Sequence, residues 1–429
     1  MKPRIFLLAL LYASLHTLVQ AREPLIRVQI ISTLDRIAIE PTGSWSIRAK
    51  RQLVLERGRQ AMVECHGPTV RLVYGDITVE DSLLTLKAIS DTGRFLIRNV
   101  PYGVGWWWEG KEDRFYEGEI TVRVAHGGRL NVVVSLPVER YLRGVVPYEI
   151  GTAPLQALRA QAVAARSEAI AAMRNRMYAG EGFDICGDVD CQVFGGTTRV
   201  TAEVDRAIRT TRGVILQSSG APINAYFASN CGGFSESIEN VWPWRSGPRP
   251  YWAAHPDADS LVVDSLQDEA HLRRWLAAEP ATYCNPQAQP GLPDWSRKYW
   301  RWKVSTPADS LGLTGTSSRA GRIVRIDSVR RGNSGRIISA VFVGENGRFR
   351  VTTELEFRQV WSPPLRSSCV VVDPQGPPSK PNRFLVTGAG WGHGVGMCQS
   401  GAVGMALAGR TAEQILQHYF PTADIAPAY

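Results

Sequence analysis

The stretch from residue 141 to residue 172 constrains the fold more than any other, because it joins a rigid turn to a long helix. A short apolar run ends at Pro147, and Glu149 comes just after that proline. Pro154 opens the next segment, and proline is tolerated in the first turn of a helix. Nearly all residues from 155 to about 173 are strong helix formers. The pattern predicts a carboxylate on a turn directly before an Ala-rich helix.

The predicted helix carries one thin apolar face and two spaced arginines. The apolar positions fall at intervals of three and four, and they are Leu155, Leu158, Ala162, Ala165 and Ala169. Arg159 and Arg166 lie seven residues apart on one side, with Gln161 between them in sequence. Two interpretations stay open at this point. The segment is either a site that binds and protonates a polar substrate, or a surface turn before an ordinary amphipathic helix.

A glycine-rich stretch from residue 388 to residue 402 favours the first interpretation. Its segment 388–396 contains five glycines, too many for the interior of a helix or strand. The stretch therefore predicts a backbone loop that displays His393, with Gln399 just beyond it. Glycine supplies no packing for a buried histidine, so a functional loop is favoured over a core segment.

Five motifs in one order resemble the SpoIID/LytB family, the stage II sporulation protein D group of cell-wall proteins. They read YLRGVVPYE (141–149), LRAQAVAARSEA (158–169), DICGDVDCQVFGG (184–196), AYFASNCGGFSES (225–237) and GWGHGVGMCQSGA (390–402). The resemblance covers about residues 115 to 421. The family includes lytic transglycosylases that cut the glycan strands of peptidoglycan, and members described only as enhancers of other wall hydrolases.

The resemblance implies a lytic transglycosylase in which Glu149 is the single catalytic residue. Such an enzyme protonates the bridging oxygen, and the same group then deprotonates the muramic acid 6-hydroxyl, which leaves a 1,6-anhydro end. Most glycoside hydrolases need two carboxylates instead. The residues expected to contact substrate are Arg159, Gln161, Arg166, Ser229, His393 and Gln399. The alternative is a non-catalytic peptidoglycan-binding protein that enhances a wall amidase.

Some relatives bind zinc near the positions of Cys186 and Cys191, with histidines completing the ligand set. This chain has no histidine between His126 and His255. We therefore expect no cofactor and a protein without stoichiometric zinc. A metal site at Cys186 and Cys191 is the weaker alternative, and a local disulfide between them competes with it.

Residues 1–21 have the pattern of a secretory signal peptide. Lys2 and Arg4 form a positive start, residues 5–15 an apolar core, and Ala21 a small residue for cleavage. The core is short for a membrane span, so an uncleaved anchor is only the alternative interpretation, and no other long apolar run follows. We expect an exported chain, in the periplasm, the cell wall or outside the cell, without a transmembrane span after cleavage.

The net charge indicates the kind of partner, and the cysteine count limits the disulfides. The formal net charge is +9, and removal of Lys2 and Arg4 with the signal peptide leaves +7. In an exported protein this favours peptidoglycan glycan strands and anionic wall polymers over nucleic acid. The family resemblance implies other wall hydrolases as protein partners. The seven cysteines leave at least one unpaired, and a Cys231–Cys398 bridge is one open pairing.

The expected fold class is α+β, a β-rich multi-part SpoIID-like fold with the Ala-rich helix at its centre. With 429 residues the chain is long enough for two or three domains. Alternating short strands and glycines predict a small β-rich domain over 22–110. The SpoIID-like domain is expected over 111–429, with an insertion-like segment at about 243–305. Trp106 to Trp108 cannot all face one core from a strand, so they either stack on sugars or fill a seam.

Overall fold

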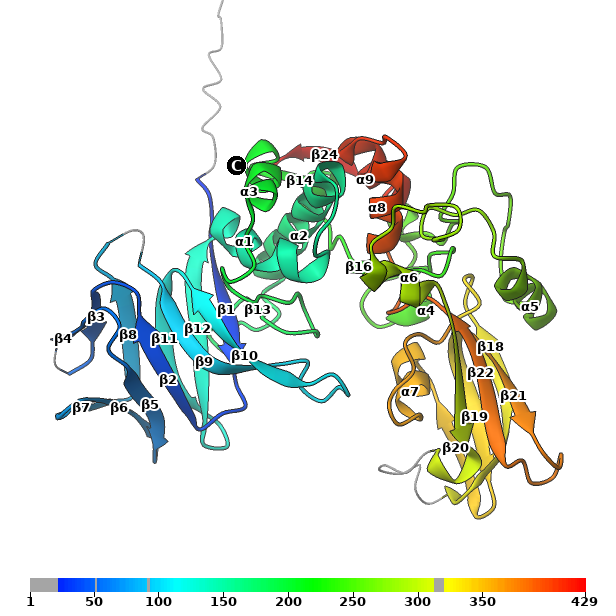
Figure 1. Ribbon diagram of the computed structural model, residues 1–429, viewed down its shortest axis with the longest axis horizontal. Coiled ribbons are helices and arrows are strands. Elements are labelled where there is room, and N and C mark those ends of the chain that lie inside the picture. Colours follow the sequence, from blue (N-terminus) through cyan, green and yellow to red (C-terminus); the bar gives the residue numbers. More distant parts are fainter. Residues whose placement is uncertain (1–21, 51, 91–92, 312–319) are drawn as a thin grey trace, which may run out of the picture.

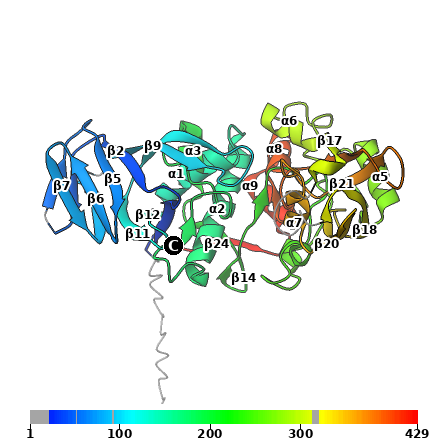
Figure 2. The same cartoon turned by 90° about the horizontal axis from the view of Figure 1, so that it is seen from below.

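The computed structural model describes residues 22–50, 52–90, 93–311 and 320–429. The expected signal peptide, 1–21, lies outside the described residues, so cleavage near Ala21 stays a prediction. Figures 1 and 2 show three parts in a row: a β-rich part in blue and cyan, a helical centre, and a second β-rich part in yellow and orange. In the described ranges, no helix combines the length and the apolar character that crossing a bilayer requires. The architecture is α+β, as expected.

The N-terminal part consists of two sheets that share one hydrophobic core. Strand β6 shows why: Val70, Leu72 and Tyr74 alternate with more exposed residues, so one face of the strand is buried. The first sheet runs β13-β1-β12-β11-β8-β3-β4, with β1 Leu25–Ile31, β3 Trp45–Arg48, β4 Gln52–Leu55, β8 Leu83–Ala88, β11 Glu119–Ala125, β12 Arg129–Pro137 and β13 Ile185–Cys186. The second runs β10-β9-β2-β5-β6-β7, with β2 Arg36–Pro41, β5 Ala61–His66, β6 Thr69–Tyr74, β7 Ile77–Asp81, β9 Phe95–Tyr102 and β10 Gly110–Tyr116.

The boundary expected near residue 110 does not coincide with a break in these sheets. Strand β10 begins at Gly110 and pairs with β9 across that position. Strand β12 pairs with β1 from Leu25↔Pro137 onward, so residues 119–137 complete the N-terminal sheet. The pairing partner of β12 lies about a hundred positions away in sequence, and strand patterns do not reveal such long-range partners.

Helix α2 is the centre of the molecule. It spans Leu155–Asn175, which confirms the predicted helix, but its burial is not confined to one face. Ala157, Ala162 and Ala165 pack in the core of the N-terminal sheets, whereas Ala160 and Ala164 pack in a second core. Small side chains allow this close approach from two sides. The elements around it are α1 Val138–Glu149, α3 Ala202–Thr210, α8 Gln399–Leu407, α9 Ala412–Tyr419, and the sheet of β14 Val214–Ser218, β15 Ala221–Pro222 and β24 Asp424–Pro427.

Glu149 is the last residue of helix α1, not a residue of a free turn. The sequence analysis took Pro147 as the stop of the apolar run, but this proline lies inside the last turn of α1. A proline near a helix end removes only one hydrogen bond, and the Ile150 N–H still bonds the Val146 carbonyl at 3.2 Å. The carboxylate is therefore held by a helix whose other face is packed in the core.

Two short strands that lie far apart in sequence form a parallel pair at the centre. Strand β16 (Phe227–Ala228) pairs with β23 (Met397–Cys398). The glycine-rich stretch before β23 alternates left-handed glycines with other residues, and Gly390, Gly392, Gly394 and Gly396 all have positive φ. A Cβ on Gly390 would lie 2.6 Å from the Asn230 carbonyl oxygen. The glycines thus let this backbone lie directly against residues 226–232.

The C-terminal β-rich part contains two three-stranded sheets around a third core. The Pro-rich residues 373–381 form the end of β21 and the turn into β22, because Asp373 to Gln375 pair with Leu385 to Arg383. The sheets contain β17 Arg301–Pro307, β18 Ile323–Arg331, β19 Ile337–Gly344, β20 Gly347–Val351, β21 Val370–Gln375 and β22 Arg383–Ala389. The remaining helical segments of the described chain are α4 Ile238–Val241, η1 Pro250–Trp252, α5 Glu269–Ala278, α6 Asp294–Trp300, η2 Ala308–Ser310 and α7 Glu354–Gln359.

Candidate active site

A pocket of about 650 Å³ brings together residues from all three parts of the molecule. The loop between β9 and β10, the end of α1, the β16 strand, and the glycine-rich loop before β23 all contribute to its lining. In the described chain, Glu149 is the one carboxylate among the lining residues. A glycoside hydrolase of the usual kind would need a second acidic group across the scissile bond.

Glu149 has neutral partners only. Its Oε1 accepts a hydrogen bond from the Val193 N–H at 2.6 Å, and its Oε2 accepts one from Gln399 Nε2 at 3.4 Å. No basic side chain of the described residues forms an ion pair with it. Burial raises the pKa of Glu149 to about 7, although the bonds from Val193 and Gln399 oppose the rise. A carboxyl group with this pKa can both donate and accept a proton at neutral pH.

The side-chain amide of Gln399 hydrogen-bonds both Glu149 and Gln161. Gln399 begins helix α8, lines the pocket and is 2% exposed. Its Nε2 also donates to Gln161 Oε1 at 3.3 Å. Gln161 is fully buried in α2 and does not line the pocket. Its position suits orientation of Gln399, and not the direct substrate contact that the sequence analysis expected.

His393 and Ser229, both expected near substrate, line the pocket. His393 Nδ1 accepts the Val395 N–H at 3.0 Å, so the neutral ring carries its proton on Nε2. Burial, and then the charges of Arg336 and Arg358, lower the pKa of His393 to about 3. The imidazole is therefore neutral at neutral pH, and it can position a substrate by a hydrogen bond but cannot serve as a cation.

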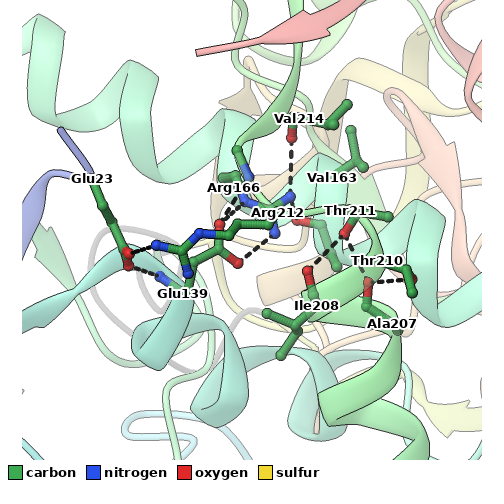
Figure 3. A network of polar contacts seen from close by, with 12 residues as sticks. Glu23, Glu139, Val163, Arg166, Ala207, Ile208, Thr210, Thr211, Arg212 and Val214 are labelled. Atoms are coloured by element: carbon green, nitrogen blue, oxygen red, sulfur yellow. Dashed lines mark hydrogen bonds and ion pairs between the residues drawn. The ribbon is translucent and has the colours of Figure 1, made fainter. Parts of the chain in front are cut away.

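Arg166 lies away from the pocket, in a buried ion pair. Its Nη2 and Nε donate to the two carboxylate oxygens of Glu139 at 2.8 and 2.9 Å, and its Nη1 donates to the Val214 carbonyl at 3.0 Å. Figure 3 shows this pair, with Arg212 and Glu23 beside it. Arg166 is fully buried, so all its donors are directed to protein groups. The expected contact with substrate must be corrected for this residue.

Arg159 does not line the pocket either. Its Nη1 donates to Gln156 Oε1 at 3.2 Å, and its Nη2 lies 3.5 Å from a carboxylate oxygen of Glu413 on α9. The expected substrate contact must be corrected here as well. The seven-residue spacing of Arg159 and Arg166 correctly indicated helical positions, but it could not indicate which neighbours surround them.

The sequence analysis left open whether Trp106 to Trp108 stack on sugars or fill a seam, and the structure places them in an aromatic wall of the pocket. Trp106 to Trp108 lie in the turn between β9 and β10, not in a strand, and all three line the pocket. Trp391 lies with its ring centroid 5.6 Å from Trp107 and 4.4 Å from Tyr299. Trp107 is 41% exposed, which leaves a ring surface free for a ligand. The unusual run of three tryptophans was the only sequence signal for this wall.

Basic side chains lie beside these rings. Lys298 is exposed next to the Tyr299 ring, and Arg366 lies over the Trp391 ring with its Cζ 5.8 Å from the centroid. Arg358 lies over Trp106 and also pairs with Glu354. Anionic groups of a ligand in the pocket would meet Lys298 and Arg366, which have no ion-pair partner among the described residues. Lys298 and Arg366 thus line the pocket, whereas Arg159 and Arg166 do not.

Cys186 and Cys191 form a disulfide, so neither sulfur is a free metal ligand. The local disulfide, one of the two readings left open by the sequence, is the one in the structure, and the metal alternative at this pair must be corrected. The disulfide closes the loop immediately before Val193. It thereby stabilises the backbone N–H that hydrogen-bonds Glu149.

Comparisons with known proteins agree with the motifs. Residues 126–217 match the model of the SpoIID family, described as stage II sporulation protein, and residues 236–396 match the model of a domain of unknown function, DUF8618. An uncharacterized protein of Brachyspira hyodysenteriae is 29% identical over 306 residues, 70% of each chain. The pocket draws on both matched segments, because Glu149 lies in the first, and Tyr299 and Trp391 lie in the second.

Two proteins of Bacillus subtilis are also similar. The amidase enhancer is 27% identical over 308 residues, which are 65% of this chain and 39% of that protein. Stage II sporulation protein D is 27% identical over 313 residues, which are 69% of this chain and 76% of that protein. The chain therefore contains a SpoIID segment, residues 126–217, and is similar along most of its length to proteins named amidase enhancer and stage II sporulation protein D.

Proposed function

We propose that this protein is a lytic transglycosylase that cleaves the glycan strands of peptidoglycan and leaves 1,6-anhydromuramic ends. The observation that carries the proposal is Glu149, a single carboxylate with a pKa raised to about 7 in a pocket lined by aromatic rings. The family resemblance supplies the substrate class. The names of the two Bacillus subtilis relatives support a role in the cell wall.

Glu149 would act first as acid and then as base. The protonated carboxyl donates its proton to the glycosidic oxygen as the bond to the anomeric carbon breaks. The resulting carboxylate accepts the proton of the muramic acid 6-hydroxyl as its oxygen attacks that carbon. The proton returns to Glu149, no water is consumed, and the product gains an intramolecular C1–O6 bond in place of the broken glycosidic bond. A single group suffices because donor and acceptor steps follow each other at one place.

The environment of Glu149 suits both steps. Burial disfavours the charged form, so the proton is present at neutral pH to be donated. The hydrogen bonds from Val193 and Gln399 then stabilise the carboxylate that forms. Gln399 is itself oriented by Gln161. These neutral donors adjust the pKa without fixing the group as a permanent anion, which a nearby arginine would do.

The aromatic wall suits the sugar chain. Sugar rings present apolar faces that stack on indole and phenol rings, and the exposed face of Trp107 beside Trp391 and Tyr299 offers such a surface. Lys298 and Arg366 lie where carboxylates of muramic acid or of a stem peptide would be bound. His393 and Ser229 remain proposed hydrogen-bonding contacts.

A second candidate is a non-catalytic enhancer of a wall amidase. The observation that favours it is the similarity to a protein named amidase enhancer. The same aromatic and basic pocket would bind glycan without cleaving it. In either case we propose that the chain acts outside the cytoplasm, after cleavage near Ala21. N-terminal sequencing of the exported protein tests this, and a mature form that keeps Met1 would contradict it.

One experiment separates the two candidates. Purified protein is incubated alone with glycan strands, with and without stem peptides, and separately with a wall amidase and intact peptidoglycan. A transglycosylase generates new strand ends without the amidase. An enhancer generates none, but accelerates release of stem peptides by the amidase. Absence of new strand ends in every preparation, with amidase acceleration intact, would overturn the proposal of catalysis.

A further inference from the structure

Three cysteines and one aspartate lie close together in the second core, beside helix α8. They are Cys231, Asp257, Cys284 and Cys398, and one ligand atom from each lies within 4.8 Å of all the others. Each of the four residues is at most 2% exposed. The three thiols are not joined to one another by disulfides. The cluster is separate from the Cys186–Cys191 pair, whose sulfurs are bonded to each other.

The spacing fits a tetrahedral metal ion. Four ligands at a Zn–S distance of about 2.3 Å place their sulfurs about 3.8 Å apart. The Sγ atoms of Cys231 and Cys284 lie 3.7 Å apart. This separation is far beyond the ~2.05 Å of a disulfide.

The surroundings of Asp257 also indicate a cation. The carboxylate is buried and accepts hydrogen bonds from the Cys284 N–H at 2.9 Å and the Tyr419 hydroxyl at 2.5 Å. Neither donor is charged, and among the described residues the one basic side chain near it is His418, whose Nε2 lies 4.0 Å from Oδ1, beyond hydrogen-bonding distance. A carboxylate this deep in a protein is normally paired with a charge or bound to a metal.

Backbone groups around the cluster suit thiolate ligands. The Cys231 and Gly401 N–H groups both donate to Cys398 Sγ, at 3.2 and 3.3 Å. Outer-shell hydrogen bonds of this kind orient metal ligands. Arg301 and Arg336 donate to the carbonyls of Gly232 and Cys231, so positive charge lies close to a site that three thiolates and a carboxylate would make negative.

We propose that Cys231, Asp257, Cys284 and Cys398 bind one structural Zn²⁺ ion. Three soft thiolates and one carboxylate select zinc over Mg²⁺ or Ca²⁺, and four protein ligands leave no open position for catalysis. The proposal reverses the expectation of a zinc-free protein, which rested on the missing histidines near Cys186 and Cys191. It does not depend on the proposed transglycosylase activity.

The ion would join segments that are distant in sequence and that the fold brings together. Cys231 follows β16 and Cys398 ends β23, whereas Asp257 and Cys284 belong to the segment between η1 and α6. The zinc would thus fasten this segment to the strand pair that carries Ser229 and Gln399 to the pocket. Cys398 directly precedes Gln399, so the ion would also hold the residue that donates to Glu149.

Metal analysis of the full mature protein, purified without chelator, tests the site. We expect about one zinc per chain, and X-ray absorption should fit three sulfurs at about 2.3 Å and one lighter ligand. Cys284→Ser and Asp257→Asn should each lose the zinc. Cys369→Ser is the matched control, because Cys369 is equally buried but outside the cluster, and it should keep the zinc. The double variant Cys186→Ser/Cys191→Ser should keep it as well.

Thiol titration of the unaltered protein keeps the test valid where a variant fails to fold. Reaction with a thiol reagent should spare Cys231, Cys284 and Cys398 until zinc is removed by a chelator, as peptide mapping can show. Three results would overturn the proposal. They are protein that neither contains nor takes up zinc, zinc that is lost from the Cys186/Cys191 double variant, and a disulfide between any two of the three cluster cysteines.

Discussion

Helix α1 carries a glutamate at each end, and the two behave in opposite ways. Glu139, in the first turn, accepts hydrogen bonds from Arg166, from the Gly213 N–H at 3.0 Å and from the Tyr429 hydroxyl at 2.6 Å. Burial alone would raise the pKa of Glu139, but these donors outweigh it and hold the pKa below its ordinary value. Glu149, at the last residue, has two neutral donors and a pKa raised to about 7.

The helix dipole acts in the same direction as the partners. A negative charge is favoured at the N-terminus of a helix and disfavoured at its C-terminus. Glu139 is thus a permanent anion that fastens α1 to α2 and to the chain terminus, whereas Glu149 keeps a proton that it can transfer. The comparison shows that the number and charge of the partners, not burial alone, separate a glutamate held as an anion from one whose pKa is raised to about 7.

Replacing Glu149 should have the largest effect. Glu149→Gln keeps the shape and can still accept from the Val193 N–H, but it has no proton to transfer. We expect cleavage of glycan strands to fall by about 10²–10⁴-fold, while folding and glycan binding persist. Strand cleavage is followed by chromatography, and binding by co-sedimentation. Undiminished cleavage by this variant would mean that Glu149 is structural, like Glu139.

Breaking the ion pair between Arg166 and Glu139, at the other end of α1, should reduce the stability of the protein. Arg166→Met leaves Glu139 buried without its cation, and removal of one partner of a buried ion pair costs about 3–5 kcal/mol. Chemical denaturation monitored by tryptophan fluorescence measures the loss. Arg159→Met is the control, because the partly exposed pair with Glu413 is worth at most about 1 kcal/mol. Equal losses from the two variants would contradict the structural role of Arg166.

The pH dependence of stability should have opposite signs at the two glutamates. The folded pKa of Glu149 lies above its unfolded value of 4.5, so the folded state binds more protons and stability falls as pH rises from 4.5 to about 7. The stability of Glu149→Gln does not fall in this way. The free energy of unfolding of the variant, relative to that of the unaltered protein, should therefore increase across that window by up to about 3 kcal/mol.

Glu139 supplies the matched comparison for this measurement. Its folded pKa is lowered, so its contribution is present above the unfolded pKa and is lost as pH falls through the folded value. The destabilisation by Glu139→Gln should therefore shrink at acid pH. Denaturation curves of both variants over the acid to neutral range give the two slopes, and slopes of the same sign would refute the comparison.

The smallest expected effect is at Gln399. Its hydrogen bond lowers the pKa of Glu149, so Gln399→Leu should raise that pKa further. The cleavage rate of the unaltered protein should fall above about pH 7, where the acid loses its proton, and the variant should show this fall at higher pH. Loss of one such bond is worth about 1 kcal/mol. Ser229→Ala, which removes no bond to Glu149, should leave the position of the fall unchanged.

Local patterns predicted the elements that depend on local physics. Thr411 and Gln414 have the spacing of a capping box, and this box is present at the start of α9. Helix α2 begins at Leu155 as expected. A cap needs two residues three positions apart, and a helix needs only a run of suitable residues, so both can be read from a short window. The α+β class and the contribution of the glycine-rich loop to the pocket were also predictable.

Residues whose neighbours are distant in sequence were beyond such patterns. Arg166 finds its partners at Glu139 and Val214, and the motif spacing carried no trace of either. The same holds for the ring of Trp391 beside Trp107, 284 positions apart, and for the cysteine cluster. The resemblance proposed residues for one site, but only the packed fold shows which of them line the pocket and which lie away from it.

The most direct test of the account is the origin of the oxygen at the new strand ends. Purified glycan strands are cleaved by the unaltered protein in ¹⁸O-labelled water, and the ends are analysed by mass spectrometry. If Glu149 alone serves as acid and base, the ends are 1,6-anhydro sugars, one water lighter than hydrolysed sugar and free of label. Reducing ends that carry the label would contradict the account, because they would require an attacking water and a second carboxylate in the pocket.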